Sequence, residues 1–168
     1  IGETQRRYAQ ACFEGFEAHA VTVNPFMGYD SLEPFLDYPG KGIYLLAVTS
    51  NPGSDDLQRR ESGGRRIFEL VGEFAERAAG EERGTEVGLV VGLTNAGEDV
   101  LAGLPDVPLL IPGLGAQGGD LSMLTGAERQ APNVVNVSRG VLYGEAGSPR
   151  ECATRYAEEI AGALQQGE

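Results

Sequence analysis

Five short apolar runs alternate with segments of helical periodicity, and this alternation constrains the fold more than any other feature. The runs lie at residues 20–25, 42–49, 87–92, 108–111 and 133–137. Between them, segments such as residues 67–79 repeat apolar side chains every three or four positions, as an amphipathic helix does. The run at 42–49 is apolar almost throughout, which is typical of a parallel strand covered on both faces. We therefore predict an α/β protein with a parallel sheet and right-handed crossovers.

Polar or glycine-rich residues follow the end of every predicted strand. They are Asn24-Pro25, Thr49-Ser50-Asn51, Thr94-Asn95, residues 113–120 and Ser138-Arg139. Both (β/α) barrels and open α/β sheets place their sites at the carboxyl ends of the strands. We expect the functional site at this edge of the sheet. Thr94 and Asn95 are also predicted to cap the helix that runs through Val100 and Leu101.

Residues 111–120, with the sequence IPGLGAQGGD, form the most distinctive of these loops. Its four glycines are Gly113, Gly115, Gly118 and Gly119. Glycine lets the backbone approach a ligand closely, and free N–H groups at the start of the next helix attract an anion. Arg139 follows the next predicted strand and supplies a guanidinium to the same place. We interpret the pair of loops as a phosphate site; the alternative is a tight turn that needs glycine only for its geometry.

A phosphate held by the last two strand–helix loops is the pattern of a (β/α) barrel, whereas an open sheet more often carries its glycine-rich loop after the first strand. We therefore predict the (β/α)8 TIM-barrel type. Such a barrel takes about 250 residues, and the sequence has 168. We expect a single domain, residues 1–168, that supplies roughly the last five strand–helix units, with three N-terminal strands absent from the sequence. Why the chain starts at Ile1 stays open.

The composition of the chain limits the classes of partner that it can bind. The formal net charge of −12 argues against nucleic acid or an acidic membrane surface as a partner. No apolar run approaches membrane-spanning length, so we expect a cytoplasmic protein without membrane contact. The lone histidine, His19, excludes a His-based metal cluster. Cys12 and Cys152 are predicted to be reduced and buried.

The basic residues are almost all arginines. Lys41, the only lysine, lies in a turn that leads into a strand, which is the wrong end of a strand for barrel chemistry. Residues 54–66 are polar and contain Gly63-Gly64, so we predict a mobile surface loop there. Its arginines, Arg59, Arg60, Arg65 and Arg66, are expected to form a solvated face. What this loop does is not evident from the sequence.

Four stretches resemble the orotidine 5′-phosphate decarboxylases of the bacterial type 2 branch. They are AVTVNP at 20–25, TSNPG at 49–53, PGLGAQGGD at 112–120 and NVSRG at 136–140, in that order. The resemblance covers essentially the whole chain. It implies a (β/α) barrel that forms a homodimer with the barrel mouths facing, and that uses no metal or organic cofactor. It also implies the conversion of orotidine 5′-phosphate to UMP and carbon dioxide, the last step of UMP synthesis.

The resemblance also assigns roles to individual residues. Arg139 matches the family's phosphate-binding arginine, and Ser138 beside it would contribute its backbone N–H. Gln117 matches the glutamine that bridges phosphate and pyrimidine, and Ser50 the serine that hydrogen-bonds the pyrimidine edge. The other matches are Pro112 as a pocket wall near the leaving carboxylate, the loop glycines at the phosphate, and Ile1 and Thr4 at the partner subunit's site, with Thr4 toward the ribose.

The catalytic residues of the family are not in this sequence. Its Asp-x-Lys-x-x-Asp motif and its further lysine have no match here, and Lys41 cannot stand in for them. Asp55 and Asp120 are interpreted as a solvated charge and a helix cap. The chain would thus carry the binding half of the site, and its activity alone stays open. One alternative is another phosphate-binding barrel, such as a sugar-phosphate decarboxylase or epimerase, although Ser50 and Gln117 suit a pyrimidine better. A non-catalytic half-barrel is the other alternative.

Overall fold

The structure, a computed structural model, describes residues 1–95, 97–114, 129–144 and 147–165. Five strands form one sheet in the order β1-β2-β5-β6-β7, and every neighbouring pair is parallel. The strands are β1 (Ala20–Val23), β2 (Gly42–Val48), β5 (Glu86–Val91), β6 (Leu109–Pro112) and β7 (Asn133–Asn136). The predicted α/β class and parallel sheet are confirmed, and all five predicted strands form close to their expected bounds.

Helical segments connect the strands. Before β1 lie α1 (Gly2–Gln10) and the π-helical turn η1 (Ala11–Gly15); before β2 lie η2 (Pro25–Met27), η3 (Tyr29–Ser31) and α2 (Glu33–Leu36). Before β5 lie η4 (Pro52–Asp56), the small strands β3 (Glu61–Ser62) and β4 (Arg65–Arg66), and α3 (Ile67–Gly80). After β5 come η5 (Leu93–Asn95) and α4 (Glu98–Leu101), and after β7 come α6 (Arg139–Leu142) and α7 (Pro149–Gln165). The helix predicted at 121–129 falls almost wholly outside the described residues.

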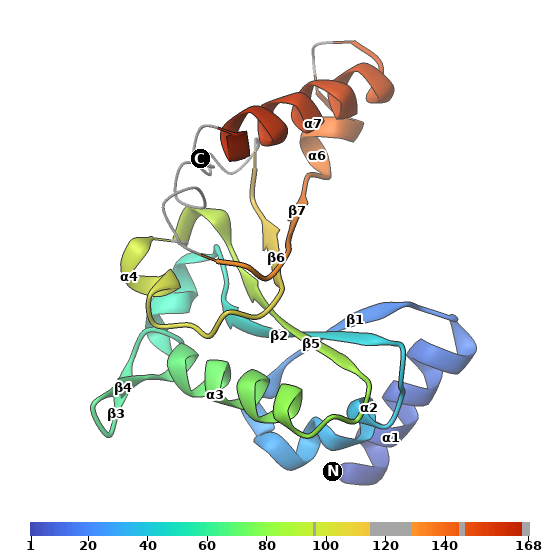
Figure 1. The fold of residues 1–168 in the computed structure, drawn as a ribbon, viewed down its shortest axis with the longest axis vertical. Helices are drawn as coiled ribbons and strands as arrows, with labels where there is room; N and C mark the ends of the chain where they lie inside the picture. The colour runs from blue at the N-terminus through green and yellow to red at the C-terminus, as the bar shows by residue number, and fades with distance from the viewer. Residues whose placement is uncertain (96, 115–128, 145–146, 166–168) are drawn as a thin grey trace.

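The core lies between the sheet and the helices on one side of it. Figure 1 shows α1, α2 and α3 along the same side of the first strands. Side chains of that face, such as Leu45, Leu89 and Leu109, are fully buried, and Phe68 of α3 is buried with them. Burying one large apolar side chain contributes about 1.5–3 kcal/mol. This layer therefore holds the helices on the strands.

The opposite face of the sheet is more open. Burial alternates along β2, where Tyr44 and Leu46 are half-buried while Ile43 and Leu45 are buried. Val134 of β7 is 46% exposed on the same open face. Among the described residues, β2 is thus fully covered on one face only, not on both as its apolar run predicted. In a (β/α) barrel this second face points to the barrel interior.

The helix α7 begins as predicted. Ser148 N donates to Glu151 Oε2 at 2.7 Å, and Glu151 N lies 3.4 Å from Ser148 Oγ, which completes a capping box. The backbone N–H of Ser148 holds the pKa of Glu151 below its usual range. Of the two cysteines, Cys152 is buried as expected, whereas Cys12 is only half-buried.

The segment predicted as a mobile loop is instead folded. Strands β3 and β4 pair antiparallel around Gly63 and Gly64, whose φ angles of 63° and 81° suit a tight hairpin turn. Arg66 is only 25% exposed, because its guanidinium donates to Glu69 and Asp99. The pKa of Glu69 is lowered because it accepts the backbone N–H of Arg66 and lies beside that guanidinium. The prediction of a solvated face is therefore wrong for Arg66.

Candidate functional site

The structure brings the predicted loops to one edge of the sheet. Ser50, Thr94, Gly113 and Arg139 follow the carboxyl ends of β2, β5, β6 and β7, which are neighbours in the sheet. Lys41 precedes β2, and its Nζ donates to the carbonyl of Ala18 at 2.8 Å. The only lysine thus lies at the opposite edge, as predicted.

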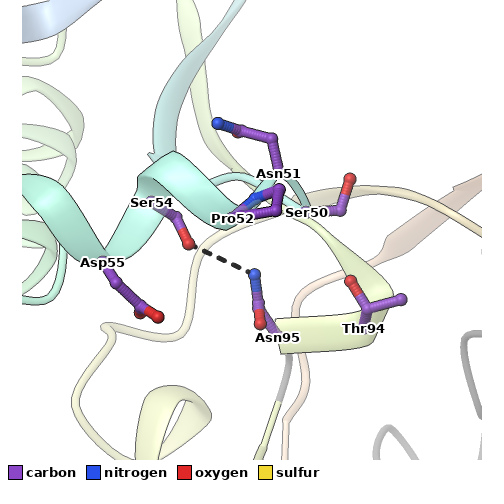
Figure 2. Close-up of a pocket in the computed structure, with 7 residues that line it drawn as sticks. All are labelled: Ser50, Asn51, Pro52, Ser54, Asp55, Thr94 and Asn95. Atoms are coloured by element: carbon purple, nitrogen blue, oxygen red, sulfur yellow. Dashed lines mark hydrogen bonds between the residues drawn. The ribbon is translucent and has the colours of Figure 1, made fainter.

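A pocket of about 530 Å³ opens between the loops after β2 and β5. Figure 2 shows the side chains that line it: Ser50, Asn51, Pro52, Ser54, Asp55, Thr94 and Asn95. All of them except Pro52 carry a hydrogen-bonding side chain. The pocket therefore suits a ligand that presents several hydrogen-bonding groups.

The strand β2 ends irregularly, two residues before Ser50. The register between β2 and β5 shifts between Leu46 and Val48, and the ladder ends where Val48 pairs with Val91. A bulge of this kind is often found beside an active site, where it re-aims the strand. Beyond it, Thr49 N donates to Gln58 Oε1 at 2.8 Å, and Gln58 Nε2 donates to Thr49 Oγ1 at 2.9 Å.

Asn95 does not cap a helix, contrary to the prediction. The helix α4 starts after Gly97 without a side-chain cap. Asn95 Nδ2 instead donates to the carbonyl of Thr49 at 2.7 Å and lies 3.4 Å from Ser54 Oγ, the contact drawn in Figure 2. The amide thus joins the end of β5 to the loop after β2.

Arg59 approaches the same pocket from the segment before the hairpin. Its Nη2 donates to the carbonyl of Asn95 at 3.2 Å, and its Nε lies 3.5 Å from Asp55 Oδ1. The Arg59 side chain is 29% exposed, whereas that of Asp55 is 76% exposed. The interpretation of Asp55 as a largely solvated carboxylate is consistent with this, and a fully solvated Arg59 is not.

The end of β6 has the geometry of a glycine turn. Pro112 is the last residue of β6 and pairs with Asn136 of β7. Gly113 is buried and has a φ of 114°, a conformation that strongly favours glycine. The rest of the predicted phosphate loop lies outside the described residues: Gly115, Gln117, Gly118, Gly119 and Asp120. Their roles stay predictions.

Arg139 lies shortly after the carboxyl end of the next strand, β7. Ser138 is the N-cap of α6, and Arg139 is its first residue. Both are exposed, and they follow the strand that pairs with β6. Strand pairing thus brings Arg139 to the same edge of the sheet as Gly113, although the two are far apart in sequence.

Ile1 and Thr4 do not join this pocket. Ile1 is the N-cap of α1 and is 75% exposed, and Thr4 in its first turn is also exposed. Neither lines the pocket beside Ser50. Their expected place at a partner subunit's site stays a prediction.

Within the described ranges, no group of three or more His, Cys, Asp or Glu side chains is placed to hold a metal ion. In the same part of the chain, no helix is long and apolar enough to cross a membrane.

The sequence did not reveal Gln58 as a partner of Thr49, because this contact depends on how residues 50–58 turn back on β2. No local pattern around Gln58 marks that turn.

A profile of the Orotidine 5′-phosphate decarboxylase / HUMPS family matches residues 1–156. The chain belongs to this family. Among curated relatives, orotidine 5′-phosphate decarboxylase of Dechloromonas aromatica is 48% identical over 149 residues, which is 85% of this chain and 54% of that protein. The enzyme of the same name from Paracidovorax citrulli is 46% identical over 168 residues, or 95% of this chain and 60% of that protein.

Solved structures of orotidine 5′-phosphate decarboxylases have the same fold. OMP decarboxylase of Leishmania donovani is 38% identical with a TM-score of 0.82, over 98% of this chain and 64% of that one. A protein described as a putative orotidine-monophosphate decarboxylase of Toxoplasma gondii is 31% identical with a TM-score of 0.86, over 99% of this chain and 65% of that one. The resemblance and the barrel-type fold are confirmed. The chain spans 54% to 60% of the length of the two curated relatives.

Proposed function

We propose that this chain carries the phosphate- and pyrimidine-binding half of an orotidine 5′-phosphate decarboxylase site. The parent enzyme converts orotidine 5′-phosphate to UMP and carbon dioxide in pyrimidine biosynthesis. The observation that carries the proposal is the placement of Ser50, Gly113 and Arg139 at one sheet edge, after β2, β6 and β7, in a chain of this family. Their order along the edge matches a ligand with a base at one end and a phosphate at the other.

In this proposal, each residue contacts a different part of the ligand. The Arg139 guanidinium offers a planar fork of donors that fits two phosphate oxygens at once. Backbone N–H groups of the loop that starts at Gly113 supply further donors. Ser50 hydrogen-bonds the pyrimidine edge, Gln117 bridges the two ends, and Pro112 walls the pocket near the leaving carboxylate.

The proton chemistry falls to groups beyond these 168 residues. Loss of carbon dioxide leaves negative charge at pyrimidine C6, which needs a nearby cation and then a proton. Lys41 cannot supply either, because its ammonium is hydrogen-bonded at the opposite edge of the sheet. We assign that role to the family's Asp-x-Lys-x-x-Asp motif, with residues 1–168 as the C-terminal part of one barrel domain. Binding of the remote phosphate would then help to stabilise the transition state.

The same proposal includes a cofactor-free cytoplasmic enzyme and a homodimer, in which exposed Ile1 and Thr4 reach the partner's site. Sedimentation of the active protein tests the dimer. A fully active monomer would contradict it.

Substitution of Arg139 tests the phosphate assignment. Arg139→Ala should weaken UMP binding to the 168-residue chain by about 3 kcal/mol, or more than about 100-fold, because two charge-assisted hydrogen bonds are lost. Titration calorimetry measures the affinity. Arg60→Ala is the control, since Arg60 is an exposed arginine in the segment before the hairpin. UMP affinity unchanged by Arg139→Ala would refute the assignment.

Turnover tests the division of labour. The 168-residue chain, its intact mass verified, should show no loss of orotidine-phosphate absorbance. A chimera that joins it behind the N-terminal part of the Dechloromonas aromatica relative should decarboxylate the substrate. A chimera that binds UMP but stays inactive would favour a non-catalytic half-barrel, and turnover by the short chain alone would contradict the proposed division.

A further inference from the structure

The backbone just before Ser50 is held by side chains instead of by a neighbouring strand. Because the β2–β5 ladder ends at Val48, the N–H and C=O of Thr49 lie beyond it. Gln58 Oε1 accepts that N–H at 2.8 Å, and Asn95 Nδ2 donates to that carbonyl at 2.7 Å. The two amides therefore hold the two peptide units on either side of the Thr49 Cα, and the second of these units includes the backbone N–H of Ser50.

Both amides are themselves anchored to rigid elements. The carbonyl of Gln58 accepts the backbone N–H of Phe68 at 3.0 Å, and Phe68 is fully buried in the first turn of α3. Asn95 N donates to the carbonyl of Gly92 at 2.9 Å, directly after β5. The two residues that hold the Thr49 backbone are thus anchored to α3, in the case of Gln58, and to the end of β5, in the case of Asn95.

Gly92 lets the loop that carries Ser50 approach the end of β5 closely. A Cβ at position 92 would lie 2.7 Å from Ser50 N and 2.9 Å from Ser50 Cβ. Gly92 N also donates to the carbonyl of Val48 at 2.7 Å. The backbone and Cβ of Ser50 therefore pack directly on the Gly92 backbone.

We propose that Gln58 and Asn95 are positioning residues that hold Ser50 for contact with the pyrimidine. The inference rests on the proposed function and adds the groups that set its specificity for the base. A side chain held in place before binding loses less conformational entropy when the ligand arrives. Neither amide needs to touch the ligand for this effect.

A comparison of two ligands separates this role from a purely structural one. UMP and ribose 5-phosphate share the sugar and the phosphate, but only UMP presents a pyrimidine to Ser50. Loss of positioning weakens UMP alone. General damage to the fold weakens both ligands, and an irrelevant side chain changes neither.

The experiment measures both affinities by titration calorimetry on the 168-residue chain. Gln58→Met, which keeps the length of the side chain, should weaken UMP about tenfold, which is the worth of one hydrogen bond, and leave ribose 5-phosphate unchanged. Gln58→Glu should restore most of the affinity, because its carboxylate still accepts the N–H of Thr49. The control is Gln130→Met, at an exposed position before β7.

Combination with Ser50→Ala shows whether Gln58 acts through Ser50. Ser50→Ala alone should also weaken the binding of UMP about tenfold. If Gln58 works by placing Ser50, the double variant loses no more than Ser50→Ala does, since residues in one network are not additive. Asn95→Leu should behave in the same way.

The possible failures are distinct. A wild-type chain that binds UMP no better than ribose 5-phosphate overturns the pyrimidine assignment of the proposed function, and the positioning role with it. A wild-type chain that prefers UMP, together with a Gln58→Met variant that keeps that preference, overturns the positioning role alone. Equal weakening of both ligands, or additive losses in the double variant, does the same.

Discussion

Gly88 should be the position in the sheet that tolerates a methyl group least. It lies in β5 and pairs with Tyr44 of β2. A Cβ there would lie 2.4 Å from the carbonyl oxygen of Pro108 and 2.7 Å from Cε1 of the Tyr44 ring. The same Pro108 carbonyl accepts the N–H of Leu89 at 2.9 Å and so helps to join β5 to β6. Gly88→Ala must therefore move the backbone of the next strand as well as the ring.

The cost follows from these two displacements. Overpacking of a well-packed region costs about 1–3 kcal/mol, and the strained interstrand hydrogen bond adds about 1 kcal/mol. The expected loss is roughly 2–4 kcal/mol in the free energy of unfolding, out of about 5–15 kcal/mol for a typical domain. For a chain of this size, each kcal/mol lowers Tm by about 2–4 °C.

Urea unfolding followed by circular dichroism measures the change. The midpoint should fall while the slope with denaturant stays constant. Gly162→Ala in α7 is the matched control, because nothing lies within 4 Å of a Cβ at that position. That variant should gain about 0.5–1 kcal/mol, as alanine suits a helix better. A Gly88→Ala chain within about 0.5 kcal/mol of the wild type would refute the steric reasoning.

Two further changes test other contacts. Thr85 Oγ1 lies 2.8 Å from the carbonyl of Leu36 and 3.0 Å from that of Tyr38. Thr85→Val should therefore lower the free energy of unfolding by about 1–3 kcal/mol, whereas Thr154→Val, at an exposed position, should not. Equal denaturation midpoints for the two variants would contradict this. The backbone N–H groups of Gln130 and Ala131, and then the charge of Arg129, hold the pKa of Asp106 below its usual range. Its contribution to stability is therefore present above the unfolded pKa of about 3.9 and is lost as the pH falls through the lower folded value. Asp106→Asn should be less stable than the wild type at pH 7, and the difference should shrink below about pH 4; a difference independent of pH would show that the charge is not what matters.

Local patterns in the sequence were enough to find the strands and the start of α7. The capping box at Ser148 involves residues three positions apart, so the sequence displays it directly. The turn at Gly113 is also local, because a positive φ selects glycine whatever surrounds it.

The contacts around Ser50 could not be predicted in this way. Asn95 reaches Thr49 across 46 residues of sequence, and Arg59 reaches Asn95 across 36. A helix cap was a reasonable expectation for Asn95, since asparagine favours caps. Its actual partner depends on which strands are neighbours, and that is a property of the whole sheet. Arg66 was misjudged for the same reason, because Asp99 lies 33 residues further along the chain.

The strand order of the sheet has a consequence for how the chain is made. Each large strand pairs with the one that precedes it among the large strands of the described chain, so the order in space repeats the order in sequence. During synthesis, each described strand after β1 finds its preceding neighbour already present, and none of the described strands has to be inserted between two earlier ones. Pairing between nearby segments also keeps the loop-closure entropy small. The described strands can therefore pair one after another, each with its helix, as translation proceeds.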